Sequence, residues 1–162
     1  MNAENIKKAE ELVKILRERG LKVTFAESCT GGLLGATITS VSGASEVFDG
    51  SIVSYANEVK ADKLGVDRNT LATVGAVSED TARQMALGAC RAFSADCAAA
   101  ITGIAGPGGG TLEKPVGTVF ISAAFRKDVR VEHCLFDGNR EEVREQSVAK
   151  ALDMLIEIIS KS

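Results

Sequence analysis

The sequence predicts one α/β domain in which helices cover both faces of a mixed, mostly parallel sheet, a three-layer α/β/α fold with a late antiparallel hairpin. Two observations lead to this class. Helix-like and strand-like segments alternate through most of the chain, and two strand-like runs joined by a tight connection come near its end. A length of 162 residues is typical of one domain, so residues 1–162 are expected to form a single domain.

The helices are predicted from apolar residues that recur at spacings of three and four. Gly20 should end the first helix, over residues 5–19, because glycine readily adopts the left-handed conformation that closes a helix. Ser78 is a good N-cap for a helix that runs to about residue 93. The other helical segments are a helix at 30–40, a short one that ends near residue 64, a helical turn at 69–74 and a last helix at 138–159.

The strands are predicted from alternation and from short apolar runs. Residues 21–25 alternate apolar and polar side chains, and residues 47–54 should form a second strand with a bend at Gly50. The run 97–101 is short, apolar and followed by glycines, which favours a buried central strand. The last two strands, expected at 118–125 and 129–136, should form an antiparallel hairpin.

Composition argues against several classes of function. The formal net charge is -3 and the basic residues form no block, so nucleic-acid binding is not expected. No apolar run is long enough to span a bilayer and no signal peptide is recognised, so we expect no membrane association. Free thiols without a targeting segment fit a cytoplasmic protein.

A metal site is not expected either. The four cysteines form no C-x-x-C pair, and His133 is the only histidine, so both the number and the spacing of zinc ligands are poor. The cysteines are Cys29, Cys90, Cys97 and Cys134.

The residues between the first strand and the next helix have two interpretations. Ser28, Cys29 and Thr30 precede two glycines, Gly31 and Gly32, where a strand is expected to turn into a helix. Unpaired N–H groups at a helix N-terminus can hold an anion or stabilise an oxyanion. Alternatively, Ser28 or Thr30 is simply an N-cap.

Standard nucleotide motifs do not match. A P-loop needs Lys and then Ser or Thr after its last glycine, and residues 103–111 contain no lysine. The dinucleotide fingerprint does not fit residues 28–32. The Tyr-x-x-x-Lys pair of short-chain reductases has one residue fewer between its members than Tyr55 and Lys60 have, so a reductase is poorly supported.

Standard serine-hydrolase motifs also fail. The nucleophile elbow needs glycine two residues before and after the serine, and Ala26 and Thr30 occupy those places around Ser28. The Ser-x-x-Lys pattern would need lysine where Gly31 stands. A Ser-His-acid triad is weakly supported because His133 lies far along the chain in a strand-like run.

Lysine can replace histidine as a base if burial lowers its pKa from about 10.4 toward neutrality. Lys60 is the best candidate, since it follows the second strand and the ends of neighbouring strands meet at one edge of an α/β sheet. Tyr55 could orient Lys60 or donate to a substrate. The alternatives are a solvated helix lysine and an ordinary tyrosine at a strand end.

Two further residues have open assignments. Cys29 is a rival nucleophile, because thiolates form readily at helix N-termini, but it also suits a small buried position. Arg140 stands at a helix start after Gly138 and could bind a phosphate. Glu141 and Glu142 already supply negative charge there, so a surface ion pair is an equal alternative for Arg140.

Five blocks of the sequence together resemble the CinA C-terminal domain family. They occur in the family's order and cover the chain from about residue 5 to residue 159. The family includes amidohydrolases that convert nicotinamide mononucleotide (NMN) to nicotinic acid mononucleotide and ammonia, in pyridine-nucleotide salvage. The blocks are residues 26–32 (AESCTGG), 55–60 (YANEVK), 75–78 (GAVS), 102–107 (TGIAGP) and 114–118 (KPVGT).

The resemblance implies a serine–lysine mechanism without a cofactor. Ser28 would be the nucleophile, Lys60 its base and Tyr55 a supporting residue. We further expect backbone N–H groups near Thr30 and Gly31 to form an oxyanion hole. The resemblance also implies that Thr102 and Gly103 line the nucleotide site, with Arg140 as the phosphate ligand and Arg144 as its rival.

The resemblance leaves other questions open. The short segment before the first strand resembles the stand-alone form of the domain, so activities of the N-terminal domain found in longer members are not expected here. A nucleotide-binding regulatory module without chemistry is the alternative function. The expected partner is NMN, and the oligomeric state stays open, a homo-oligomer included.

Overall fold

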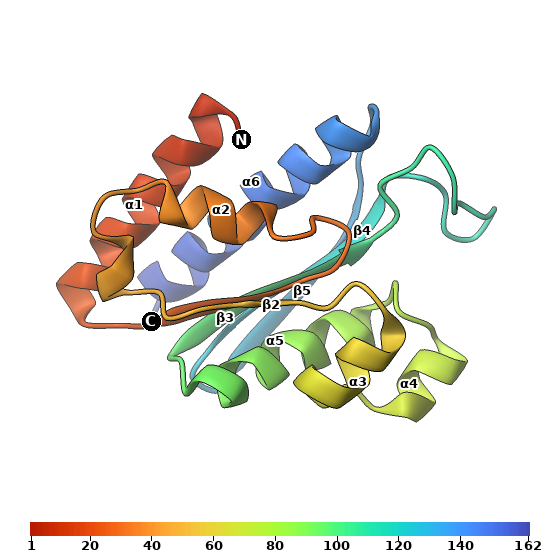
Figure 1. Ribbon diagram of the computed structural model, residues 1–162, viewed down its shortest axis with the longest axis horizontal. Helices are drawn as coiled ribbons and strands as arrows, with labels where there is room; N and C mark the ends of the chain where they lie inside the picture. The colour runs from red at the N-terminus through yellow and green to blue at the C-terminus, as the bar shows by residue number, and fades with distance from the viewer.

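A five-stranded mixed sheet with strand order β2-β1-β3-β4-β5 forms the centre of the protein (Figure 1). It is described by a computed structural model that covers residues 1–162. β1 pairs in parallel with β2 and β3, whereas β4 is antiparallel to both β3 and β5, so only β4 opposes the other four strands. The predicted fold class is confirmed. The strands are β1 Val23–Glu27, β2 Ile52–Val53, β3 Cys97–Gly103, β4 Thr118–Phe125 and β5 Asp128–Leu135.

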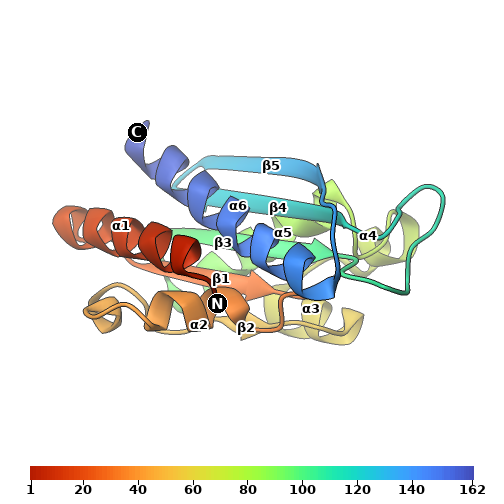
Figure 2. The same ribbon diagram turned by 90° about the horizontal axis from the view of Figure 1, so that it is seen from above.

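Helices cover both faces of this sheet (Figures 1 and 2). One layer contains α1, α2 and α6, and the opposite layer contains α3, α4 and α5. The expected helical turn at 69–74 is α4, and a short 3₁₀ helix, Ala44–Glu46, follows α2. The helices are α1 Ala3–Arg19, α2 Leu33–Thr39, α3 Asn57–Leu64, α4 Arg68–Thr73, α5 Glu79–Phe93 and α6 Arg140–Ser160.

Side chains of different size face the two layers. Large apolar residues of the strands, such as Phe25 and Ile121, pack with α1, α2 and α6. The face toward α5 is built mostly from alanines, among them Ala26, Ala98 and Ala100. Small side chains allow α5 to approach the sheet closely, so the alternation of size along the strands determines how each layer packs.

Several predicted helix ends are confirmed. Gly20 and Gly65 close α1 and α3 in the left-handed conformation, with φ of 65° and 69°. The Ser78 hydroxyl accepts a hydrogen bond from the Thr81 N–H at 3.3 Å and caps α5. Local sequence therefore determined these boundaries.

Two predicted elements are shorter than expected. The strand expected at 47–54 is only Ile52–Val53, with an isolated bridge between Val23 and Phe48 before it. The helix expected from residue 30 begins at Leu33, because Gly31 and Gly32 have φ of 59° and 105°, outside the helical region.

α5 and α3 are in close backbone contact. A Cβ atom added to Gly88, in α5, would lie 1.8 Å from the carbonyl oxygen of Leu64, the last residue of α3. Only glycine allows this approach. Lys60 lies one turn earlier in α3, so the contact also determines where Lys60 sits.

None of the helices has the combination of length and apolar character needed to cross a bilayer.

Candidate active site

Ser28 directly follows β1 and lies in a turn at the carboxyl edge of the sheet. Its N–H donates to the Ile101 carbonyl of β3 at 2.9 Å, and the Gly31 N–H donates to the Ser28 carbonyl at 3.0 Å, which closes the turn. Ser28 is 8% exposed and lines a cavity of about 280 Å³. The nucleophile candidate is therefore tied to two neighbouring strands yet open to a ligand.

Lys60 reaches Ser28 from α3. Its Nζ lies 3.0 Å from the Ser28 Oγ, 2.8 Å from the Ser54 carbonyl and 3.2 Å from the Tyr55 carbonyl. Two N–H bonds directed to two carbonyls leave the third tetrahedral direction of the amine facing Ser28. In neutral lysine that direction holds the lone pair, which can accept the hydroxyl proton.

The surroundings of Lys60 favour its neutral form. The side chain is 1% exposed and no carboxylate is hydrogen-bonded to it. Burial lowers the pKa of Lys60 below the 10.5 of an exposed lysine, because an ammonium loses hydration in the interior. The 3.0 Å separation is within the range typical of a nucleophile and its base.

Ser28 and Lys60 share the cavity with residues from three loops. The carboxyl ends of β1, β2 and β3 meet there, as expected for an α/β sheet. Arg140 is the permanently charged side chain of the lining, and no acidic residue belongs to it. The cavity therefore suits an anionic ligand. The sequence did not single out the lining residues Asn57, Ala76 and Val77, although Asn57 lies in the block 55–60 and the other two lie in the block 75–78.

Thr102 and Gly103 lie in the cavity wall, as expected from the resemblance. The Thr102 hydroxyl donates to the Ala76 carbonyl at 2.8 Å and joins the end of β3 to the loop before α5. A Cβ atom at Gly103 would lie 2.7 Å from the Thr118 carbonyl oxygen, so β4 excludes any side chain there.

Tyr55 contacts Lys60 through its backbone and not through its hydroxyl. The side chain is 62% exposed at the cavity, and its hydroxyl accepts a hydrogen bond from Arg140 Nη2 at 3.2 Å. Arg140 Nη1 also donates to the Gly106 carbonyl at 2.8 Å. Arg140 thus bridges the segments on two sides of the cavity, and three of its five N–H donors form no hydrogen bond within the protein.

Thr30 and Gly31 lie beside the cavity but do not line it. The Gly31 N–H is occupied by the Ser28 carbonyl, and Thr30 is 0% exposed, so neither N–H group is open to a ligand. The Cys29 N–H has no acceptor within the protein, and Cys29 does line the cavity. The Cys29 N–H is therefore a better candidate for an oxyanion donor than the two N–H groups expected from the sequence.

Cys29 is a poor rival nucleophile in this setting. Burial, together with the nearby carboxylate of Glu27, raises the pKa of the Cys29 thiol to about 11. At neutral pH the thiol is protonated, and the protonated form reacts slowly. Arg144, the rival to Arg140, does not line the cavity either; its Nη2 donates to the Thr30 carbonyl at 2.8 Å.

The N-terminus of α2 is not free to bind an anion. The buried carboxylate of Glu27 accepts hydrogen bonds from the N–H groups of Leu34 and Gly35, both at 2.9 Å. It also accepts one from the Thr30 hydroxyl at 2.7 Å. A carboxylate from the protein itself therefore occupies the site that the sequence suggested for a ligand or for a simple serine or threonine cap. Sequence patterns search for caps directly before a helix, and Glu27 lies six residues before Leu33.

The fold and the site together define the class of this protein: a three-layer α/β/α domain with a serine and a buried lysine at the carboxyl edge of its sheet. The chain belongs to the CinA C-terminal domain family, whose sequence profile matches residues 5–159.

Relatives of known sequence and structure agree with this assignment. A competence/damage inducible protein from Agrobacterium tumefaciens has a TM-score of 0.95 and 43% identity, and the match covers 98% of this chain and 97% of that one. A CinA superfamily protein from Klebsiella pneumoniae has a TM-score of 0.94 and 34% identity, with 100% of both chains covered. A CinA-like protein from Syntrophobacter fumaroxidans is 48% identical over 145 residues, which are 90% of this chain and 34% of that protein. This chain thus spans about a third of the length of the curated relatives it matches.

Proposed function

We propose that this protein is an amidohydrolase that converts NMN to nicotinic acid mononucleotide and ammonia by a Ser28–Lys60 mechanism. The observation that carries the proposal is the 3.0 Å contact between a cavity-lining serine and a buried lysine. The family resemblance supplies the substrate, and a cavity that contains Arg140 and no carboxylate fits the phosphate of a nucleotide.

In the first half of the reaction, neutral Lys60 accepts the Ser28 hydroxyl proton as the Oγ attacks the carboxamide carbon. The negative charge that develops on the carboxamide oxygen is stabilised by the Cys29 N–H. Protonated Lys60 then donates its proton to the departing nitrogen. The C–N bond breaks, ammonia leaves, and nicotinate remains bound to Ser28 as an ester.

In the second half, neutral Lys60 takes a proton from a water molecule that attacks the ester carbon. The C–O bond to Ser28 breaks and the proton returns to the Oγ, which releases nicotinic acid mononucleotide. Arg140 would hold the phosphate with its remaining donors, while Thr102 and Gly103 form the wall beside the ribose and ring. No step requires a group that the chain and water do not supply.

Ammonia release from NMN by the purified protein, measured in the presence of EDTA, tests the activity. We expect turnover with EDTA present and its loss in Ser28→Ala with an unchanged fold. Cys29→Ala is the matched control, because it removes the neighbouring thiol without touching the hydroxyl. Full activity in Ser28→Ala would refute the mechanism.

If the wild type releases no ammonia from NMN even at high enzyme concentration, the proposed activity itself is refuted. Saturable NMN binding without product, measured by calorimetry, would instead favour a nucleotide-binding regulatory module. The glycine-rich loop and Arg140, which line the cavity, would serve binding in either case.

A further inference from the structure

Thr30, two residues after Ser28, is held from two sides by side chains outside the cavity. Its hydroxyl donates to the Glu27 carboxylate at 2.7 Å, and its carbonyl accepts from Arg144 at 2.8 Å. Thr30 is fully buried, and neither it nor its two partners lines the cavity. These contacts therefore serve the turn and not the ligand.

The Glu27 carboxylate is itself fixed by α2. It accepts the N–H groups of Leu34 and Gly35, both at 2.9 Å, in the first turn of that helix. Backbone donors at a helix N-terminus, together with the helix dipole, stabilise a buried carboxylate without a cation. Thr30 is consequently anchored to a rigid element on this side.

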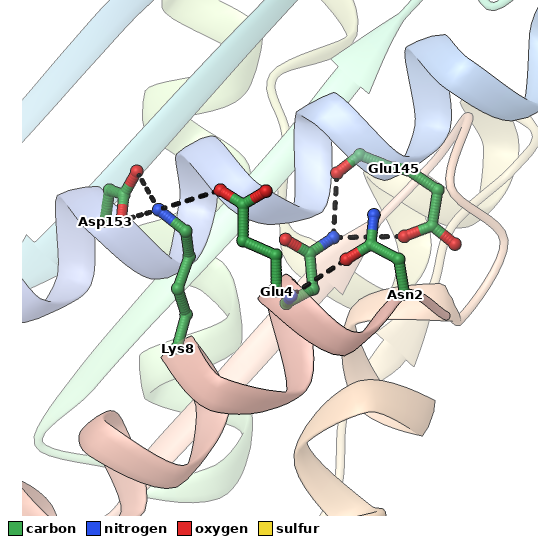
Figure 3. Close-up of polar contacts among 6 residues, drawn as sticks. Asn2, Glu4, Lys8, Glu145 and Asp153 are labelled. Carbon is green, nitrogen blue, oxygen red and sulfur yellow. Dashed lines mark hydrogen bonds and ion pairs between the residues drawn. The ribbon is translucent and has the colours of Figure 1, made fainter.

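Arg144 lies in α6, and polar contacts that begin at the next residue, Glu145, join α6 to α1 (Figure 3). The Asn5 side-chain amide donates to both the carbonyl and the carboxylate of Glu145 at 3.0 Å. Lys8 and Asp153 form an ion pair at 2.6 Å two turns further along (Figure 3). Thr30 is thus anchored to the α1–α6 pair on its other side.

The turn that carries Ser28 has little backbone support of its own. Ser28 to Gly31 form a turn closed by one backbone hydrogen bond, with Cys29 and Thr30 in the middle. Two glycines, Gly31 and Gly32, follow it and leave the chain there free to rotate. Contacts to both the side chain and the carbonyl of Thr30 limit this movement, and with it the displacement of Ser28 and of the Cys29 N–H.

We propose that Glu27 and Arg144 are positioning residues that act through Thr30 to hold the turn carrying Ser28 and the Cys29 N–H. The inference rests on the proposed function for its kinetic consequence. Since the three residues touch neither ligand nor reacting atoms, their loss should lower kcat and leave KM for NMN unchanged.

Thr30→Val tests the positioning role, because valine has nearly the shape of threonine but lacks the hydroxyl that contacts Glu27. We expect kcat to fall by roughly 10- to 100-fold, because misplacing one oxyanion donor or the nucleophile has effects of this order. Thr30→Ser, which keeps the hydroxyl, should restore most of kcat. Thr37→Val is the matched control, because Thr37 is also fully buried and its hydroxyl donates only to the Leu33 carbonyl within α2. It should leave kcat unchanged.

Arg144→Met separates positioning from phosphate binding. The same fold-loss in kcat on NMN and on nicotinamide riboside, which lacks the phosphate, is the expected result. A rise in KM confined to NMN would overturn the proposal and assign Arg144 to the phosphate, and an unchanged kcat in both Thr30→Val and Arg144→Met would overturn it as well.

A fluorophosphonate probe gives a readout that does not need NMN turnover. Such a probe phosphonylates an activated serine, and intact mass measures the rate at Ser28. We expect Thr30→Val and Arg144→Met to label at least 10-fold more slowly, with the midpoint of the pH–rate profile unmoved because it belongs to Lys60. Slow labelling in the variants, with a wild type that is labelled but inactive on NMN, would support the positioning role of Glu27 and Arg144 and refute only the substrate. A wild type that is not labelled would overturn both.

Discussion

Replacing Gly88 by alanine should weaken catalysis from a position that no ligand can touch. The added Cβ would lie 1.8 Å from the Leu64 carbonyl oxygen, and real contacts of this kind are not shorter than 3.0 Å. α3 must therefore move away from α5 by at least about 1.2 Å. The clash is with backbone, so no side-chain rotation can relieve it.

This displacement moves the candidate base. Lys60 is one turn from Leu64 in the same eight-residue helix, and its amine lies 3.0 Å from the Ser28 hydroxyl. A misplacement of about 1 Å typically costs up to about 100-fold in rate, so we expect kcat for NMN to fall roughly 10- to 100-fold. Overpacking should also lower the free energy of unfolding by about 1–3 kcal/mol.

The sign of the stability change makes the test decisive. Glycine inside a helix costs about 0.5–1 kcal/mol relative to alanine, so without the clash Gly88→Ala would stabilise the protein. Urea unfolding and NMN kinetics measure both effects. Ala92→Gly, at an exposed site in α5, is the control that reports the helix-propensity effect alone with kcat unchanged. A Gly88→Ala protein that is more stable than the wild type, or equally active, would refute the reasoning.

Three other predictions concern the cavity. The rate of Ser28 phosphonylation should rise with pH through a midpoint below 10.5, because only neutral Lys60 accepts the proton; a rate independent of pH from 6 to 10.5 would exclude Lys60 as the base. The lowered pKa of Lys60 means that, as pH falls below about 10.5, the lysine is protonated in the unfolded chain while it is still neutral in the folded protein. The free energy of unfolding of the wild type should therefore fall relative to that of Lys60→Met, by up to about 1.4 kcal/mol per pH unit, as measured by urea unfolding. Tyr55→Phe should leave kcat within about threefold and raise KM for NMN, since the lost hydroxyl contacts Arg140 and not Lys60; a loss of kcat above about 100-fold would assign the hydroxyl a direct role.

Much of the fold was predictable because its signals are local. Helix ends at Gly20, Gly65 and Ser78 and the hairpin between β4 and β5 depend on residues next to one another in the chain. The second strand was overestimated because its pairing depends on a neighbour far away. A Cβ atom added to Gly50 would lie 2.8 Å from the Phe93 ring, and the sequence does not show that these two residues meet.

The candidate site was predictable in its residues but not in its contacts. The meeting of Ser28 and Lys60 at one sheet edge was expected because each residue follows a predicted strand, and because both lie in family blocks. The role of Glu27 did not, because its carboxylate caps a helix that begins after the turn it precedes. Arg144 stayed a rival to Arg140 for the phosphate because the sequence cannot show that its guanidinium reaches the Thr30 carbonyl, 114 residues away in the chain.

The two carbonyls that hold Lys60 have a consequence for how this site can vary. They belong to the main chain of Ser54 and Tyr55, so the direction of the base does not depend on which side chains those positions carry. A protein with the same backbone can carry another side chain at position 55, and so change the edge of the cavity, while the lysine amine keeps the same orientation. Chemistry and selectivity are in this way separable within one dipeptide.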